Sequence, residues 1–244
     1  VLLVVLDTVR ADALSAYGNP RPTTPQLDAI ADAGVRFADV TAEGSWTWPS
    51  HATLFTGEPP WVHGAHFAPP TDGGMQVGPD PFHAAAMRED LPTLAERFGA
   101  AGYRTVSISA NRLIAHDFGL ARGFEAASNP DDDAGVVAGA RAALAADDDR
   151  PLLLFANLYG AHAPFDIHPV AWLKGRPELA PETAPAWLRP FLVKGGTRVN
   201  LFIAAPGATH LGLFAYMRGD LAIPPAGQRL LKDVYEGEVS LVDL

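Results

Sequence analysis

Two oxygen-bearing side chains, Asp7 and Thr47, are the first candidates for chemistry in this sequence. Asp7 directly follows an apolar run, residues 1–6, which has the length and β-branched content of a buried strand. Ligands collect beyond the carboxyl ends of parallel strands, so Asp7 is either a helix N-cap or a metal ligand, and both remain open at this point. For the nearby Arg10 and Asp12, a local ion pair is favoured over a catalytic role.

Thr47 begins the segment Thr-Trp-Pro-Ser-His. Pro49 suits the first turn of a helix and Gly57 its end, so we expect a helix over residues 49–56 with Thr47 at or just before its start. The free N–H groups there favour anions and could hold the oxygens of a phosphorus or sulfur centre while an alcohol attacks it. An alcohol needs a base or a metal to ionise it, so the segment taken alone favours Thr47 as a helix cap.

The elements around these residues alternate between strands and helices. Strands are expected at residues 1–6, 35–40, 103–109 and 152–158, and helices at residues 24–34, 49–56, 91–101 and 134–146. This order predicts an α/β fold with a mainly parallel central sheet flanked by helices. Residues 59–81, rich in Pro, Gly and His, predict a surface loop, and the Pro-punctuated residues 167–227 predict a cap or insertion on the substrate side.

Composition narrows the possible classes. The 244 residues fit one α/β domain or at most two small ones, and 18 Lys+Arg against 28 Asp+Glu give a charge of −10. This acidic balance argues against a nucleic-acid partner or an anionic membrane surface. The absence of Cys excludes a disulfide framework and a Cys nucleophile. No apolar run reaches the roughly 18 residues of a membrane-spanning helix.

The compartment stays open, with the cytoplasm slightly favoured. The chain opens on a strand-like run without Met, so we expect its N-terminus to be clipped.

Several segments, in order along nearly the whole chain, resemble the sulfatase-like branch of the alkaline phosphatase superfamily. They are Asp-Thr-Val-Arg-Ala-Asp (7–12), Thr-Thr-Pro-Gln-Leu-Asp (23–28), Gly-Val-Arg-Phe (34–37), Thr-Trp-Pro-Ser-His (47–51), His-Gly (63–64), Gly-Tyr-Arg-Thr (102–105), Ser-Ala-Asn (109–111), His-Ala-Pro-Phe (162–165) and Tyr-Glu-Gly-Glu (235–238). The resemblance implies that residues 1–244 are the N-terminal part of a single sulfatase-like α/β domain, with a cap at about 167–227 and an incomplete C-terminus.

The resemblance also implies roles for single residues. Asp7 matches a ligand of a divalent metal, and Thr47 matches the nucleophile, whose oxygen also contacts that metal. His162 matches a histidine that contacts the anionic group of the substrate, although a histidine satisfied at a strand end remains an alternative. His51 occupies a position where sulfatases carry Arg.

Three further residues take weaker assignments. Arg10 fits the common Asp-Thr-x-Arg-x-Asp variant of the first motif, and with Asn111 it is a candidate for substrate binding. His63 is expected to be structural, packing the turn before Gly64.

Departures from the family pattern define the expected subtype. Formylglycine arises from Cys or Ser, and Thr47 has no route to that aldehyde, so no formylglycine is expected. The sequence resembles members that use a Thr alkoxide with Ca, Mg, Mn or Zn. It implies a hydrolase or transferase acting on small-molecule, glycan or lipid esters of sulfate or phosphate.

The family's other metal ligands lie in an Asp-His or Asp-Asn pair beyond the Tyr-Glu-Gly-Glu helix. No Asp-His pair occurs in this sequence, which ends at Leu244, soon after the expected start of that helix. We therefore expect a fragment that binds metal weakly and turns over poorly or not at all. The alternative function is a catalytically inactive binding protein with the sulfatase fold.

Overall fold

The computed structural model describes residues 1–68, 75–76, 83–115, 119–165, 171–176, 179, 183–192, 215–216 and 219–243. The chain divides into two compact units. The first unit is Val1–Val5 with Asp39–Leu158, and the second is Leu6–Ala38 with Tyr159–Leu244. Among the described residues, no helix combines the length and the apolar character needed to cross a membrane.

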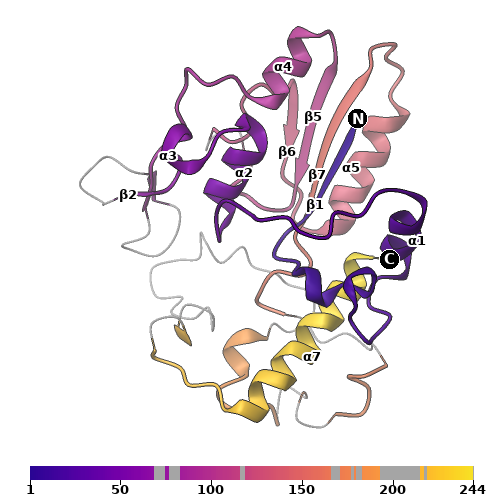
Figure 1. The fold of residues 1–244 in the computed structure, drawn as a ribbon, viewed down its shortest axis with the longest axis vertical. Coiled ribbons are helices and arrows are strands. Elements are labelled where there is room, and N and C mark those ends of the chain that lie inside the picture. Colours follow the sequence, from indigo (N-terminus) through magenta and orange to yellow (C-terminus); the bar gives the residue numbers. More distant parts are fainter. Residues whose placement is uncertain are drawn as a thin grey trace. The chain divides into compact units, whose positions relative to one another are not determined.

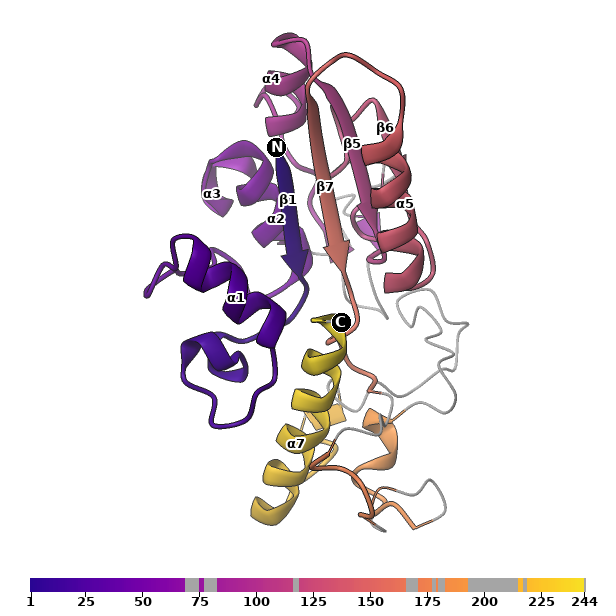
Figure 2. The same cartoon turned by 90° about the vertical axis from the view of Figure 1, so that its right-hand side faces the viewer.

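The first unit contains a four-stranded sheet (Figure 1). Its order is β1 (Leu2–Leu6), β7 (Leu152–Leu158), β5 (Arg104–Ser109) and β6 (Ala126–Ser128). Strand β5 pairs in parallel with β6 and with β7, and the arrows of β1 and β7 run the same way in Figure 2. Ser109 stands opposite Asn157 in this register. The carboxyl ends of β5 and β7 therefore meet at one edge of the sheet.

Helices cover both faces of this sheet (Figure 2). On one face lie α2 (Thr47–Thr56) and α4 (Leu94–Ala100), and on the other lies α5 (Asp133–Ala145). The core under α2 contains Trp48, Phe55 and Phe155, all buried. On the α5 side, a Cβ at Gly139 would lie 3.1 Å from the Ile108 side chain, so glycine permits the close approach of α5 to β5.

The remaining elements of the first unit are small. Helix α3 (Pro60–His63) follows α2 in the chain. A three-stranded antiparallel sheet consists of β2 (Phe67–Ala68), β4 (His83–Ala84) and β3 (Met75–Gln76), in that order.

The second unit contains the 3-10 helices η1 (Ala11–Ala13), η2 (Ser15–Tyr17) and η6 (Arg189–Phe191), with the α-helices α1 (Pro25–Ala33) and α7 (Pro225–Val242). Leu230 and Val234 of α7 belong to the same buried apolar cluster as Leu188 and Phe191. This cluster is the main core of the unit.

Asp243 caps α1 from the other end of the sequence. Its carboxylate accepts hydrogen bonds from the backbone N–H groups of Gln26 and Leu27, both at 2.8 Å. Thr24 occupies the N-cap position but makes no capping hydrogen bond, because its hydroxyl accepts one from the N–H of Ser15 instead. A buried carboxylate at a helix N-terminus satisfies free N–H groups and complements the helix dipole.

The predicted fold class, a mainly parallel sheet flanked by helices, is confirmed. The predicted strand at residues 35–40 is wrong: no strand forms there, and Val35 and Val40 are 82% and 78% exposed. An apolar run without a neighbouring strand has no ladder to join. The predicted helix at 91–101 begins later, at Leu94, because Thr93 forms a capping box with Glu96.

The predicted loop at residues 59–81 and the strand β6 also differ from expectation. The predicted loop at 59–81 contains α3, β2 and β3, while residues 69–74 and 77–81 lie outside the described residues. Strand β6 was not predicted.

Helix α7 begins at Pro225, ten residues before the Tyr-Glu-Gly-Glu segment, which lies in the second half of this helix. Most of the predicted cap at 167–227 lies outside the described residues. Of its described part, Trp187 packs so closely on α7 that a Cβ at Gly227 would lie 2.7 Å from its ring.

Candidate active site

Thr47 is the first residue of α2. The helix starts here because Trp46 is extended, with φ −149° and ψ 167°, and it ends at Gly57, whose φ of 76° is left-handed. It therefore begins two residues before the predicted start. Thr47 stands in the first turn, where backbone N–H groups lack partners within the helix and the dipole favours negative charge.

Asn111 holds the hydroxyl of Thr47. Its side-chain Nδ2 donates a hydrogen bond to Thr47 Oγ1 at 2.9 Å, and its Oδ1 accepts one from the N–H of Leu113 at 3.0 Å. Asn111 is only 3% exposed. An N–H donor directed at a hydroxyl oxygen stabilises the ionised form of that oxygen more than the neutral one. Asn111 thus lies beside the nucleophile candidate, while substrate binding by Asn111 stays a prediction.

Two polar residues at the strand ends support Asn111. Ser109 Oγ lies 3.1 Å from both Asn157 Oδ1 and the Asn111 carbonyl, and it accepts a hydrogen bond from the Asn111 N–H at 3.0 Å. Both Ser109 and Asn157 are fully buried. Sequence reasoning missed them, although a polar residue that ends an apolar strand was a usable signal.

His51 lies one turn after Thr47 and is buried. Its Nδ1 is 2.9 Å from the Thr47 carbonyl oxygen, which can only accept, so Nδ1 carries a proton. The ring lies edge-on to Phe55 and Phe155, with centroids 6.1 Å apart in each case. These contacts hold the first turn of α2, and substrate contact by His51 stays a prediction.

His63 is structural, as expected. It is fully buried, its Nδ1 accepts from the N–H of Ala65 at 3.0 Å, and its Nε2 lies 3.0 Å from Thr53 Oγ1. Burial lowers the pKa of His63, so the ring is neutral at pH 7.

In the second unit, the loop that carries Asp7 is fixed by Tyr235 of α7. The Tyr235 hydroxyl donates to the Thr8 carbonyl at 2.9 Å and accepts from the Arg10 N–H at 2.8 Å. Burial raises the pKa of Tyr235, so the phenol keeps its proton. Asp7 is buried, and η1 has Arg10 at its N-cap position, so Asp7 does not cap that helix.

The other predicted residues of this unit have local partners. Arg10 forms a bidentate ion pair with Asp12, with both N–O distances 2.8 Å, which confirms the local ion pair favoured above. The His162 ring stacks on Tyr159 at 4.3 Å, and its Nδ1 lies 2.5 Å from the Ala163 carbonyl oxygen.

Arg10 and His162 line one cavity of about 480 Å³ within the second unit. Its other lining residues are mainly apolar and include Phe165, Phe191 and Tyr235. Such a cavity suits an apolar or amphipathic group that presents a polar end to the histidine and the arginine.

A metal ion was expected between Asp7 and Thr47. Within the part of the chain that the structure describes, no group of three or more His, Asp or Glu side chains could hold a metal ion. Asp7 and Thr47 offer two oxygen donors, whereas divalent cations in proteins take at least four ligands. The described donor set is therefore incomplete.

A family model for sulfatases matches residues 1–172. Arylsulfatase A from Bos taurus is 35% identical over 108 residues, which cover 43% of this chain and 19% of that protein. An N-acetylglucosamine-6-O-sulfatase from Bacteroides thetaiotaomicron is 29% identical over 120 residues, which cover 49% of this chain and 19% of that protein. The match thus spans about a fifth of the length of these curated relatives.

Solved structures agree on the fold. A protein in complex with its substrate D-glucosamine-2-N,6-O-disulfate gives a TM-score of 0.55 at 18% identity, covering 69% of this chain and 36% of that one. The C-terminal periplasmic domain of EcEptC from Escherichia coli, solved with zinc, gives 0.51 at 15% identity, covering 99% of this chain and 55% of that one. At such identities the likeness concerns the fold alone.

Proposed function

The chain belongs to the sulfatase family, and on that premise we propose that Thr47 is the nucleophile of a hydrolase or transferase acting on sulfate or phosphate esters. The observation that carries the proposal is the hydrogen bond from Asn111 to the Thr47 hydroxyl at the first turn of α2. The alternative of a catalytically inactive binding protein is not favoured, because a chain released from catalysis has no need to hold this hydroxyl in place.

In the proposed reaction, Thr47 Oγ1 forms a bond to the sulfur or phosphorus centre as the bond from that centre to the ester oxygen breaks. The hydroxyl proton leaves Thr47, and the departing ester oxygen takes up a proton, so that an alcohol is released. The N–H groups of the first turn of α2 stabilise the anionic oxygens of the centre. Water, or an acceptor alcohol in a transferase, then cleaves the Thr47 ester.

Supporting roles follow from the contacts above. Asn111 fixes the direction of the Thr47 lone pairs and favours the alkoxide. His51 holds the helical turn, and its Nε2 is a candidate contact for the substrate. We further propose that His162 and Arg10 contact the substrate from the 480 Å³ cavity.

We propose Asp7 and Thr47 as two ligands of a divalent cation. A cation bound to a hydroxyl lowers its pKa and so favours the alkoxide. Further ligands for such a cation are needed beyond the described residues. Calorimetry of residues 1–244 with Mg, Mn, Ca and Zn salts is expected to give no tight binding, and an affinity below about 1 μM would contradict this expectation.

The reaction is tested on the protein as it is encoded, with 4-nitrophenyl sulfate, 4-nitrophenyl phosphate and bis(4-nitrophenyl) phosphate. Thr47→Val keeps the side-chain shape but removes the hydroxyl, so turnover of the preferred ester should be lost. Thr47→Ser should retain part of it. Thr41→Val, at an exposed threonine of the same unit, is the matched control.

Rapid quenching followed by peptide mass spectrometry should find one sulfate or phosphate group on the peptide that contains Thr47. Turnover by Thr47→Val near the level of the unmodified protein would refute the nucleophile assignment. An adduct on another residue would also refute it. The same mass spectrometry on the protein before substrate is added should find an unmodified Thr47. A formylglycine at this position would contradict the prediction that none forms.

A further inference from the structure

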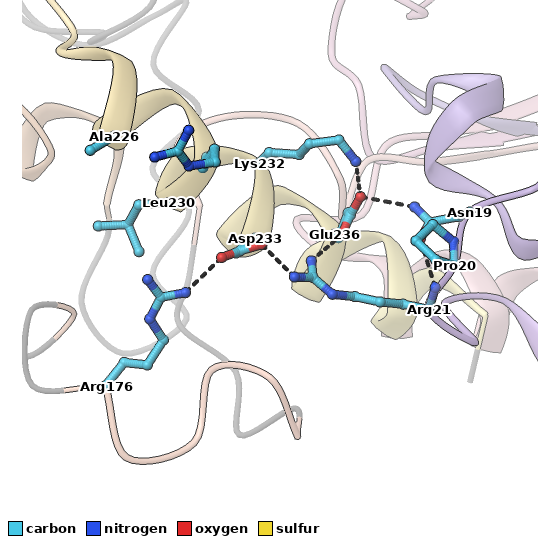
Figure 3. A pocket seen from close by; sticks show the side chains of 10 residues that line it. Asn19, Pro20, Arg21, Arg176, Ala226, Leu230, Lys232, Asp233 and Glu236 are labelled. Atoms are coloured by element: carbon cyan, nitrogen blue, oxygen red, sulfur yellow. Dashed lines mark hydrogen bonds and ion pairs between the residues drawn. The ribbon is translucent and has the colours of Figure 1, made fainter.

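A second cavity of the second unit, about 560 Å³ in volume, is lined by charged side chains (Figure 3). We call it the basic pocket. Its charged residues are Arg21, Arg176, Arg229, Lys232, Asp233 and Glu236. Among the described residues that line it, four cationic groups face two carboxylates, in a chain whose formal charge is −10.

The carboxylates lie beneath the cations. The side chain of Glu236 is 2% exposed and that of Asp233 is 18% exposed, whereas Arg21, Arg176 and Lys232 are 33%, 30% and 53% exposed. A molecule that enters the basic pocket thus meets N–H groups before it meets carboxylate oxygens. This order favours an anion over a cation as the ligand.

The buried carboxylates hold the cationic groups in place. Arg21 pairs with Asp233 at 2.7 Å and also with Glu236, and Arg176 pairs with Asp233 at 2.6 Å. Lys232 pairs with Glu236. Figure 3 shows these side chains joined in one network along α7. Donors that are already ordered lose little conformational entropy when a ligand binds.

The same network keeps Glu236 ionised. Burial opposes ionisation, but hydrogen bonds from Lys232, Asn19 and Arg21 outweigh it and hold the pKa of this carboxyl below its usual value. The Arg21 guanidinium also lies 5.3 Å from the centre of the Trp172 ring, a further contact that fixes its position.

Arg229 completes the wall of the basic pocket. It is exposed, and it forms no ion pair with any residue that the structure describes. Arginine presents several N–H groups in a planar fork that matches the oxygens of phosphate and sulfate. Its charge is not offset by a carboxylate of the network.

We propose that the basic pocket binds a doubly charged tetrahedral anion, a sulfate or phosphate group, in addition to the ester that reacts at Thr47. The four cationic side chains of the pocket can together donate several N–H groups to the oxygens of one such group. The anion comes either from a second sulfate or phosphate group of the substrate or from the free inorganic ion.

Calorimetric titration with sodium sulfate and sodium phosphate at low ionic strength tests the site directly, with sodium chloride as the control salt. Arg229→Gln and Arg176→Gln should each weaken sulfate or phosphate binding by about five- to tenfold, the usual size of one lost charge-assisted contact. Arg141→Gln, at an exposed arginine of α5, should leave the affinity unchanged. Thermal unfolding of each variant checks that the fold is kept.

Thr47→Val separates this site from the proposed reaction, because it should abolish turnover and leave anion binding intact. Saturable binding that survives Arg229→Gln but is lost in Thr47→Val would overturn the proposal, as would no saturable binding at all. The source of the anion is distinguished by KM. If Arg229→Gln raises KM for a disulfated ester but not for its monosulfated analogue, the pocket takes a group of the substrate. If neither KM changes while inorganic sulfate binding weakens, it takes the free ion.

Discussion

The hydrogen bond between Asn111 and Thr47 can be measured without any substrate. Thr47→Val keeps the shape of the side chain but removes the oxygen that accepts the partly buried hydrogen bond from Asn111. The loss of one such hydrogen bond costs about 0.5–1.5 kcal/mol. Asn111→Ala removes this donor and also the acceptor of the Leu113 N–H, so we expect a loss of about 2–4 kcal/mol in the free energy of unfolding.

The double variant Thr47→Val/Asn111→Ala should lose less free energy of unfolding than the two single variants together, because each single change already breaks the same hydrogen bond. The expected coupling is about 1 kcal/mol. Urea unfolding followed by tryptophan fluorescence measures all three variants. Trp48 is a local reporter, since it is buried next to Thr47 and its Nε1 donates to the Ala85 carbonyl at 2.8 Å.

The control pair is Thr41→Val with Asn111→Ala, which should be additive within about 0.5 kcal/mol. If the Thr47 and Asn111 changes are equally additive, the hydrogen bond does not stabilise the fold. The reasoning that Asn111 orients the nucleophile would then be wrong.

Three further predictions concern stability. Burial holds the pKa of His63 below its usual value of about 6.5, so the free energy of unfolding falls as the pH drops below 6.5 and the buried ring must take up a proton. His63→Gln should make the free energy of unfolding less dependent on pH in this range, as measured by urea unfolding at a series of pH values. Gly123→Ala should lower the free energy of unfolding by about 2–4 kcal/mol in thermal unfolding, because its Cβ would lie 2.5 Å from the Glu96 side chain at a φ of +87°. Gly119→Ala is the control, since a Cβ there meets open space, and it should lower the free energy of unfolding by only about 1 kcal/mol. Glu236→Ala removes the buried carboxylate that Arg21 and Lys232 share, and it should lower the free energy of unfolding in urea by about 2–4 kcal/mol. We expect the lower end of this range because both cationic partners reach solvent. An unchanged free energy of unfolding would contradict a structural role for the network.

Local patterns predicted much of the sheet. Residues 152–158 form an apolar run that is recognisable as a buried strand, and β7 has these bounds. Residues 35–40 carry the same signal but form no strand, because strand formation also needs a neighbour that the local sequence does not specify. The short β6 has too few residues to carry a pattern.

The candidate site divides in the same way. Thr47 was found from helix signals and motif resemblance, and Asn111 from resemblance alone. Asp243, which caps α1, lies 217 positions after Gln26 and 216 positions after Leu27 in the sequence. No local pattern can therefore encode this contact. The contacts of Tyr235 with the loop after β1 were missed for the same reason.

The two hydrogen bonds of the Tyr235 hydroxyl also determine when the loop after β1 can be completed. Its partners Thr8 and Arg10 precede it by 227 and 225 residues. During synthesis on the ribosome, the loop after β1 therefore emerges at least 225 residues before the phenol that fixes it. Such distant contacts form late, after the chain between them has been ordered. The loop that carries Asp7 can therefore take its final conformation only after α7 has left the exit tunnel.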